Sequence, residues 1–132
     1  MNLAEIALAF VEKINAHDVP ALCALMAENH VFVDSDGNRV AGREVMRAGW
    51  TKYLEWFPDY HIAAEELLEC GEVVAIFGSA RGTYAGDGRQ AERTPWEIPA
   101  AWKAIVREGR VVEWRVYANM EAVRRQMEEG AR

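Results

Sequence analysis

The sequence predicts an α+β fold in which helices near the N-terminus pack on one face of a curved antiparallel sheet. Two observations support this prediction. Apolar residues recur at the three-and-four spacing of helix faces in the first part of the chain, and long strand-like segments joined by short turns follow from residue 60 onward. A chain of 132 residues has the size of one domain, so we expect a single domain over residues 1–132.

Two helices are predicted at the start of the chain. Residues 3–14 place their apolar side chains on one helical face, and Asn2 with Glu5 three residues later has the spacing of a capping box. Asp18 is a suitable cap for a second, shorter helix, in which Pro is tolerated in the first turn. The apolar residues expected to face inward from this second helix are Leu22, Leu25 and Met26.

A strand and a third helix follow. Residues 30–34 form a short apolar run that ends at Asp34, and residues 35–38 have the composition of a turn. The third helix is expected to begin after Gly42 and to stop at Pro58. Its apolar residues again share one face: Met46, Trp50, Tyr53, Leu54 and Phe57.

The second half of the chain is predicted to consist of strands and a final helix. Glycine-containing turns separate the strand-like segments, and sequential hairpins imply antiparallel pairing. Asn119 is a suitable cap for a last helix that reaches about Glu129. The predicted strands are residues 60–69, 73–84, 96–107 and 110–117.

Composition excludes several classes of function. The net charge is −6 and the 15 Lys and Arg residues are scattered, which argues against nucleic-acid binding. No segment approaches the ~18 consecutive apolar residues of a membrane span. Cys23 and Cys70 lie far apart, which predicts two reduced thiols in a cytoplasmic protein. No His or carboxylate cluster has metal-ligand spacing, so we expect neither a metal nor another cofactor.

The order of these elements resembles a known family. Residues 10–18, the strand ending at Asp34, and residues 42–44, 57–60 and 109–115 are similar to the SnoaL-like polyketide cyclase branch of the nuclear transport factor 2-like superfamily, which includes ketosteroid isomerases. The resemblance implies a cystatin-like cone, in which a strongly curved antiparallel sheet is closed by the N-terminal helices around a pocket. It also implies a homodimer, since proteins of this resemblance commonly pair through the exposed sheet face.

The resemblance makes Asp34 the candidate catalytic residue. It falls where the ketosteroid isomerases keep their carboxylate base. Phe10 stands where the isomerases carry a hydrogen-bonding Tyr, Trp102 where they carry a protonated Asp, and Trp50 in place of a supporting Tyr. Losing such donors to an enolate costs several kcal/mol of transition-state stabilisation, so steroid isomerisation by that mechanism is not expected.

Aromatic residues supply the candidate pocket wall. We expect the substrate-binding residues to include large side chains on the predicted inward faces, although such residues also fill ordinary cores. Asp34 has a structural alternative as well, because an Asp before Ser-Asp-Gly can bind the backbone amides of its own turn. The candidate substrate-binding residues are Phe10, Trp50, Tyr53, Trp102 and Trp114.

Three functional hypotheses remain open from the sequence. The first is a cofactor-independent isomerase or cyclase in which Asp34 removes a proton from a carbon next to a carbonyl group. The second is a non-catalytic protein that binds a small hydrophobic molecule in an aromatic-lined pocket. The third is a dimeric interaction domain that uses the outer face of the sheet.

Overall fold

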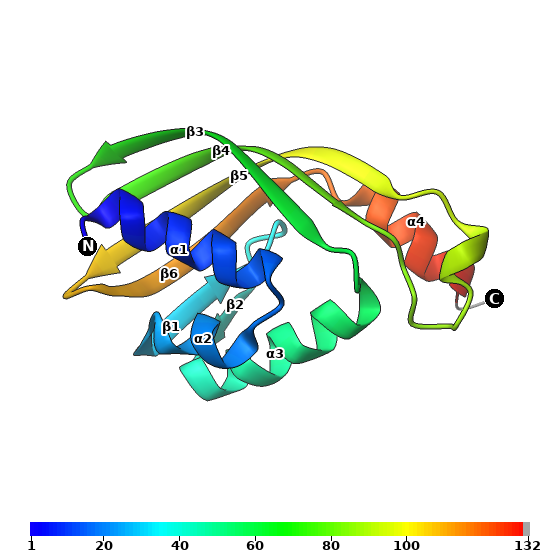
Figure 1. Cartoon of the computed structure of the whole chain (residues 1–132), viewed down its shortest axis with the longest axis horizontal. Helices are drawn as coiled ribbons and strands as arrows, with labels where there is room; N and C mark the ends of the chain where they lie inside the picture. The colour runs from blue at the N-terminus through cyan, green and yellow to red at the C-terminus, as the bar shows by residue number, and fades with distance from the viewer. Residues whose placement is uncertain (131–132) are drawn as a thin grey trace.

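The computed structural model, which describes residues 1–130, has the α+β arrangement that the sequence predicts. Figure 1 shows the chain running from the N-terminal helices into the sheet and ending in a helix beside it. The elements are α1 (Leu3–Asn15), α2 (Val19–Ala24), β1 (Met26–Val33), β2 (Arg39–Ala41), α3 (Arg43–Trp56), β3 (His61–Cys70), β4 (Val73–Gly82), the single turn η1 (Gln90–Glu92), β5 (Trp96–Arg107), β6 (Arg110–Ala118) and α4 (Glu121–Gly130).

The first two helices begin at the predicted caps. The Asn2 side chain accepts a hydrogen bond from the backbone N–H of Glu5 at 2.8 Å, and the Asp18 side chain accepts one from Ala21 at 3.1 Å. Each cap satisfies an amide group that would otherwise lack a partner at the helix start. Met26 differs from the prediction, because α2 ends two residues earlier and Met26 begins β1.

The sheet has six strands in the order β2-β1-β6-β5-β4-β3. Strands β3 to β6 pair antiparallel with their sequence neighbours, as the turns between them predict. Strand β1, however, pairs with β6 in parallel and places Phe32 opposite Trp114. The sheet is therefore mixed, and the expected all-antiparallel pairing is corrected at this pair. Hairpin turns could not reveal it, because β1 and β6 are far apart in the chain.

Strand β2 is not predicted by the sequence, since three residues are too few for an alternating pattern to show. It folds back on β1 through the turn at residues 34–38, in which Gly37 has a φ of +85°. The Asp34 N–H donates to the carbonyl oxygen of Asn38 at 3.0 Å and closes this turn. Asp34 is thereby fixed at the end of β1.

The sheet bends strongly, and part of the bend has a local cause in β3 and β4. The register shifts between Ala64 and Glu66, which leaves Glu65 as an extra residue in the ladder. On the facing strand lies Gly78, where an added Cβ would stand 1.8 Å from the carbonyl oxygen of Ala63. Glycine is required here because the two backbones approach too closely for any side chain.

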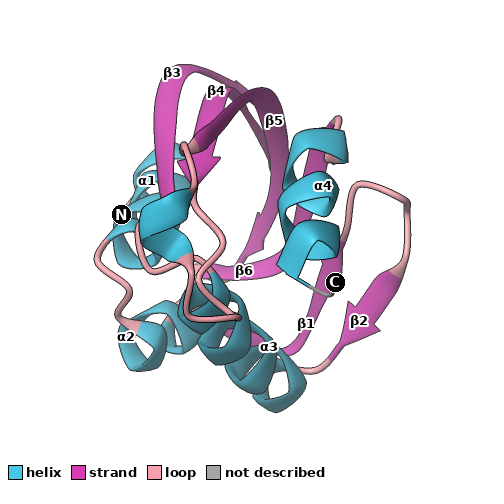
Figure 2. Ribbon diagram, turned by 90° about the vertical axis from the view of Figure 1, so that its right-hand side faces the viewer, coloured by secondary structure: helices cyan, strands magenta, loops and turns pink. Residues whose placement is uncertain are grey.

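Helices line the concave face of the curved sheet (Figures 1 and 2). Helix α1 packs across β3 to β6, α3 packs against β1 and β2, and α4 contacts β5. Strand β5 alternates buried residues with exposed or half-buried ones along its length, so one of its faces belongs to the interior. Within the described residues no helix is both long and apolar enough to cross a membrane.

His30 lies in the interior, and we expect it to make the protein less stable at acidic pH. Its side chain is fully buried, and its Nδ1 atom lies 2.8 Å from the carbonyl oxygen of Val111. Burial lowers the pKa of His30 from about 6.5, although the Val111 carbonyl and the charge of Glu113 oppose this shift. The unfolded chain therefore binds a proton more readily than the folded chain. The stability contributed by His30 is complete above pH ~6.5 and is lost as the pH falls through the lower folded-state pKa.

Denaturant unfolding at a series of pH values between 7.5 and about 5 checks this prediction. His30→Gln removes the titrating group, so its free energy of unfolding should fall less steeply with acidity than that of the wild type. His61→Gln is the matched control: partial burial and then Arg81 lower the pKa of His61, but the ring is only half-buried. Equal pH slopes for the wild type and His30→Gln would contradict the assignment.

Candidate functional site

A cavity of about 330 Å³ lies between α3 and the concave face of the sheet. Its rim is formed by the β1–β2 turn, with Asp34 and Ser35, and by Met120 at the start of α4. Most of its lining is carbon. Six aromatic side chains, which we call the aromatic wall, contribute to it: Phe32, Trp50, Tyr53, Tyr60, Trp96 and Trp102.

Local structure explains why these rings point inward. In α3, Met46, Trp50 and Tyr53 follow one another at helical spacing and occupy the face turned toward the sheet. In β5, Trp102 lies six positions after Trp96, and because this offset is even the two side chains share the concave face. Helix and strand together present aromatic side chains to the same enclosed space.

Successive rings of the aromatic wall contact one another at steep angles. The centroids of Phe32 and Trp50 are 6.2 Å apart with planes at 76°, and those of Trp50 and Tyr53 are 6.1 Å apart at 84°. Tyr53 and Tyr60 lie at 5.2 Å and 88°, and Tyr60 and Trp96 at 6.1 Å and 51°. The first three contacts are edge-to-face and the fourth is tilted, and such aromatic contacts stabilise the wall.

Hydrogen-bond donors are abundant around the cavity. The Nε1 atoms of Trp50, Trp96 and Trp102 are buried without a hydrogen-bond partner in the described structure. Burial raises the pKa of Tyr53, and burial together with the nearby Tyr53 raises that of Tyr60. Both phenols therefore stay protonated at neutral pH and can donate a hydrogen bond to a ligand.

Asp34 is half-buried at the rim and is, within residues 1–130, the single charged side chain among the lining residues. Its Oδ1 accepts hydrogen bonds from the backbone N–H groups of Asp36 and Asn38, both at 2.9 Å. Its Oδ2 accepts one from the Asn38 side-chain amide at 3.2 Å. A carboxylate offers about four lone-pair positions, so Oδ2 keeps one that a ligand can use.

The turn that carries Asp34 is tied to α4. The guanidinium of Arg124 donates to both carboxylate oxygens of Asp36 at 3.0 Å. The Asp36 N–H in turn binds Asp34, so a chain of contacts runs from α4 to the candidate base. Because the Arg124 and Asp36 side chains are both exposed, this ion pair contributes little to stability.

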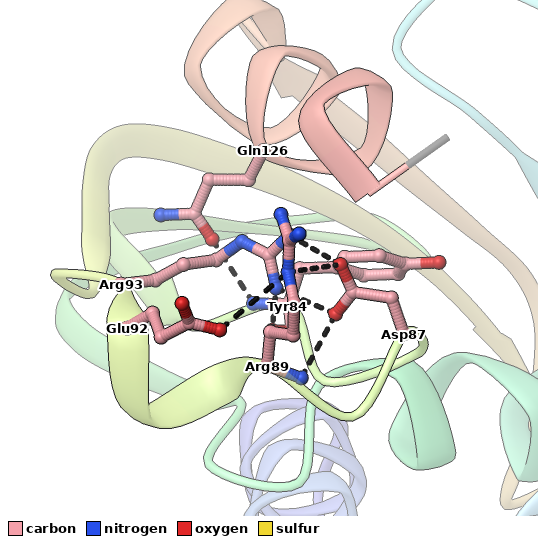
Figure 3. Close-up of polar contacts among 6 residues, drawn as sticks. All are labelled: Tyr84, Asp87, Arg89, Glu92, Arg93 and Gln126. Carbon is pink, nitrogen blue, oxygen red and sulfur yellow. Dashed lines mark hydrogen bonds and ion pairs between the residues drawn. The ribbon is translucent and has the colours of Figure 1, made fainter. Parts of the chain in front are cut away.

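The loop between β4 and β5 is anchored by a network of polar contacts (Figure 3). Arg93 donates to the two carboxylate oxygens of Asp87 at 2.8 and 2.7 Å and to the Tyr84 carbonyl at 3.0 Å. The Gln126 side chain on α4 accepts a hydrogen bond from the Tyr84 N–H. The hydrogen bonds from Arg93 hold the pKa of Asp87 well below its usual range. This network fixes the segment that leads directly into Trp96.

The structure brings together four of the six residues predicted for the site. Asp34, Trp50, Tyr53 and Trp102 all line the cavity. Phe10 and Trp114 lie elsewhere: both are fully buried and pack on each other, with ring centroids 4.6 Å apart. The helical and strand periodicities correctly predict that these two side chains face the interior. Periodicity does not show, however, whether the interior beside a side chain is packed or contains a cavity.

Three further members of the aromatic wall, Phe32, Tyr60 and Trp96, were not among the predicted site residues. Trp96 had a usable signal in the sequence. It occupies every second position of β5 together with Ile98, Ala100 and Trp102, so these four side chains share one face of the strand. Tyr60 follows the end of α3 and carried no periodic signal of its own. Within residues 1–130 no group of three or more His, Cys, Asp or Glu side chains could hold a metal ion.

Comparison with known proteins places this geometry in a family. The family model described as the SnoaL-like domain matches residues 7–114. No curated protein matches the chain. A candidate polyketide cyclase from Pseudomonas putida superimposes with a TM-score of 0.84 at 23% identity, covering 96% of this chain and 98% of the other.

Two other solved structures show the same fold. IdmH, a candidate polyketide cyclase from Streptomyces antibioticus, has a TM-score of 0.79 at 22% identity and covers 97% of this chain and 99% of its own. A Catenulispora acidiphila protein with a ketosteroid isomerase-like fold was solved in complex with trimethylamine. Its structure superimposes with a TM-score of 0.79 at 22% identity, and the match covers 92% of this chain and 91% of the other. The segment matched by the family model runs from within α1 to within β6, and the chain belongs to the SnoaL-like domain family.

Proposed function

We propose that the cavity binds a small hydrophobic molecule and that Asp34 acts on it as a general base. The aromatic wall around a cavity of about 330 Å³ is the observation that supports this proposal most strongly. Ligand cavities commonly have volumes of about 300–1,000 Å³, mostly apolar walls and a few polar groups. A fused two-ring molecule matches a cavity at the lower end of this range. The trimethylamine complex of a protein with the same fold also supports a small organic ligand.

The proposed chemistry is proton transfer at carbon. The free lone pair of Asp34 Oδ2 takes a proton from a carbon next to a carbonyl group, and the C–H electron pair moves to form an enolate. The carbonyl oxygen then carries the negative charge, which the protonated Tyr53 and Tyr60 can stabilise by hydrogen bonding. Where a C=C bond is conjugated with the enolate, Asp34 returns the proton to the far carbon of that bond and completes an isomerisation. Where the enolate carbon instead attacks a second carbonyl carbon, a ring closes and the alkoxide formed takes the proton back from Asp34.

Binding is tested with 2-tetralone, a fused two-ring ketone with an acidic C–H beside its carbonyl. We expect it to quench Trp emission, because three indoles line the cavity. Ala100→Phe should lower the affinity at least tenfold by filling the space, whereas Ala101→Phe should not, because Ala101 lies on the other face of the same strand. Unchanged emission, or equal affinities of these two variants, would contradict the proposal.

A non-catalytic binding function is the second candidate. One observation favours it: Asp34 already accepts three hydrogen bonds from its own turn, which is what a purely structural aspartate does. Under this alternative the aromatic wall holds the ligand and the carboxylate orients it. Exchange of the ligand's acidic proton with solvent separates the two candidates, because binding alone leaves that proton in place.

We also propose that the protein forms a homodimer through the outer face of the sheet. Phe77 and Tyr117 are 42% and 46% exposed and flank Ala101 on neighbouring strands. They border a shallow groove that includes Glu65 and Glu66. On the same face, near β6, Lys103 and Arg39 pair with Glu113 at 2.8 and 3.4 Å. A two-fold axis would bring the acidic side of one copy to the basic side of the other.

Sedimentation of the wild type at micromolar concentration should show about twice the monomer mass of 14.9 kDa. Phe77→Glu should shift the protein to monomer, because it introduces a buried, unpaired charge at the centre of the interface. Leu68→Glu is the matched control, since Leu68 is 58% exposed but does not line the groove. A wild-type monomer, or a dimer unaffected by Phe77→Glu, would contradict this assembly.

A further inference from the structure

The electrostatic character of the cavity selects one class of ligand. Aromatic faces carry partial negative charge, and Trp attracts cations most strongly among the aromatic residues. The single charged side chain of the lining within the described residues, Asp34, is also negative. No Lys, Arg or His of residues 1–130 lines the cavity, so no cationic side chain there balances an anionic ligand.

We propose that the molecule bound in this cavity carries a methylated ammonium group, held among the rings of the aromatic wall with Asp34 as its counter-charge. The proposal rests on the binding function proposed above and not on catalysis by Asp34. Neighbouring rings at 76°, 84° and 88° form adjoining walls of a box, an arrangement that surrounds a roughly spherical cation with aromatic surface. The free lone pair of Asp34 Oδ2 faces no cation of the protein within hydrogen-bonding distance in the described structure.

The lining also discriminates among cations. A primary ammonium group requires about three hydrogen-bond acceptors once it leaves water, and the lining supplies mainly donors, from the indoles and the two phenols. A methylated ammonium group has few or no N–H bonds to satisfy and is more weakly hydrated. It therefore enters an aromatic box at a lower desolvation cost, and its charge is met by the rings and the carboxylate.

A pair of compounds of the same shape tests this inference. Trimethyl(phenyl)ammonium and tert-butylbenzene differ only in a charged nitrogen in place of a carbon. Titrated against the full-length protein at 0.15 M salt and followed by Trp emission, the cation should bind at least tenfold more tightly. In a merely hydrophobic cavity the order is reversed, because the cation alone loses favourable hydration on entering.

Variants locate the preference in the cavity. Tyr53→Leu removes one ring but keeps an apolar side chain, and should weaken binding of the cation at least fivefold with less than a twofold effect on tert-butylbenzene. Tyr53→Phe, which retains the ring, should keep the preference. Asp34→Asn should also weaken binding of the cation selectively, because it removes the counter-charge and keeps the shape.

The wild-type comparison decides the proposal even if a variant fails to fold. Equal or tighter binding of tert-butylbenzene would overturn the ammonium assignment and leave the proposed binding function intact. Binding of neither these two compounds nor 2-tetralone at millimolar concentration would instead contradict the binding function itself.

Discussion

Asp34→Asn is expected to slow the exchange of the acidic C–H protons of bound 2-tetralone with D2O by about 10²–10⁴-fold, the usual contribution of a positioned general base. The amide keeps the size of the carboxylate but cannot accept the proton. Affinity for the ketone should stay within about tenfold, since the aromatic wall supplies most of the contact. NMR spectroscopy follows the exchange directly, as the loss of the proton signal next to the carbonyl.

Asp36→Asn is the matched control for this experiment. Asp36 belongs to the same turn, but its carboxylate contacts Arg124, and its hydrogen bond to Asp34 comes from the backbone N–H. We expect exchange in this variant to remain within a few-fold of the wild type. If the two variants exchanged at equal rates, Asp34 would not be the base, and the non-catalytic binding function would be preferred.

Trp114→Ala is expected to lower the free energy of unfolding by about 3–5 kcal/mol, the range typical of a buried Trp or Phe replaced by Ala. Trp114 is fully buried and packs on Phe10 at a centroid distance of 4.6 Å. Removing the indole leaves a void that the surrounding strands and α1 cannot close. Denaturant unfolding with an unchanged m-value provides the measurement.

Tyr117→Ala serves as the comparison on the same strand, because its side chain is 46% exposed and contacts Arg115 on the outer face. Measured at low protein concentration, where the proposed dimer does not contribute, it should cost no more than about 1 kcal/mol. Phe10→Leu should likewise destabilise the fold while leaving affinity for 2-tetralone unchanged. A large loss of affinity in Phe10→Leu would return Phe10 to the binding site.

Much of the fold follows from local patterns in the sequence. The helix caps at Asn2 and Asp18, the long β5 and the hairpins from β3 to β6 depend on residues close together in the chain. Strand β2 and the parallel pairing of β1 with β6 do not follow from such local patterns. The first is too short for a periodic signal, and the second depends on long-range contacts that a single sequence does not display.

The site was predictable to a similar extent. Asp34, Trp50 and Trp102 could be placed because a strand end and two periodic faces point inward. The periodicity also predicts that Phe10 and Trp114 face inward, but these two side chains pack on each other in the core. Sequence patterns could not show this, because the space left beside a buried ring depends on how several elements pack together. The donor of Tyr60 becomes evident only when the segment after α3 is seen to pack on Trp96 at the start of β5.

A crystal structure of the protein with 2-tetralone tests the central claim most directly. We expect the ketone to lie inside the aromatic wall, with its acidic carbon about 3–3.5 Å from Asp34 Oδ2 and its carbonyl oxygen within hydrogen-bond reach of Tyr53 or Tyr60. A cavity filled by rearranged side chains, or a ketone bound only on the outer surface at saturating concentration, would contradict it.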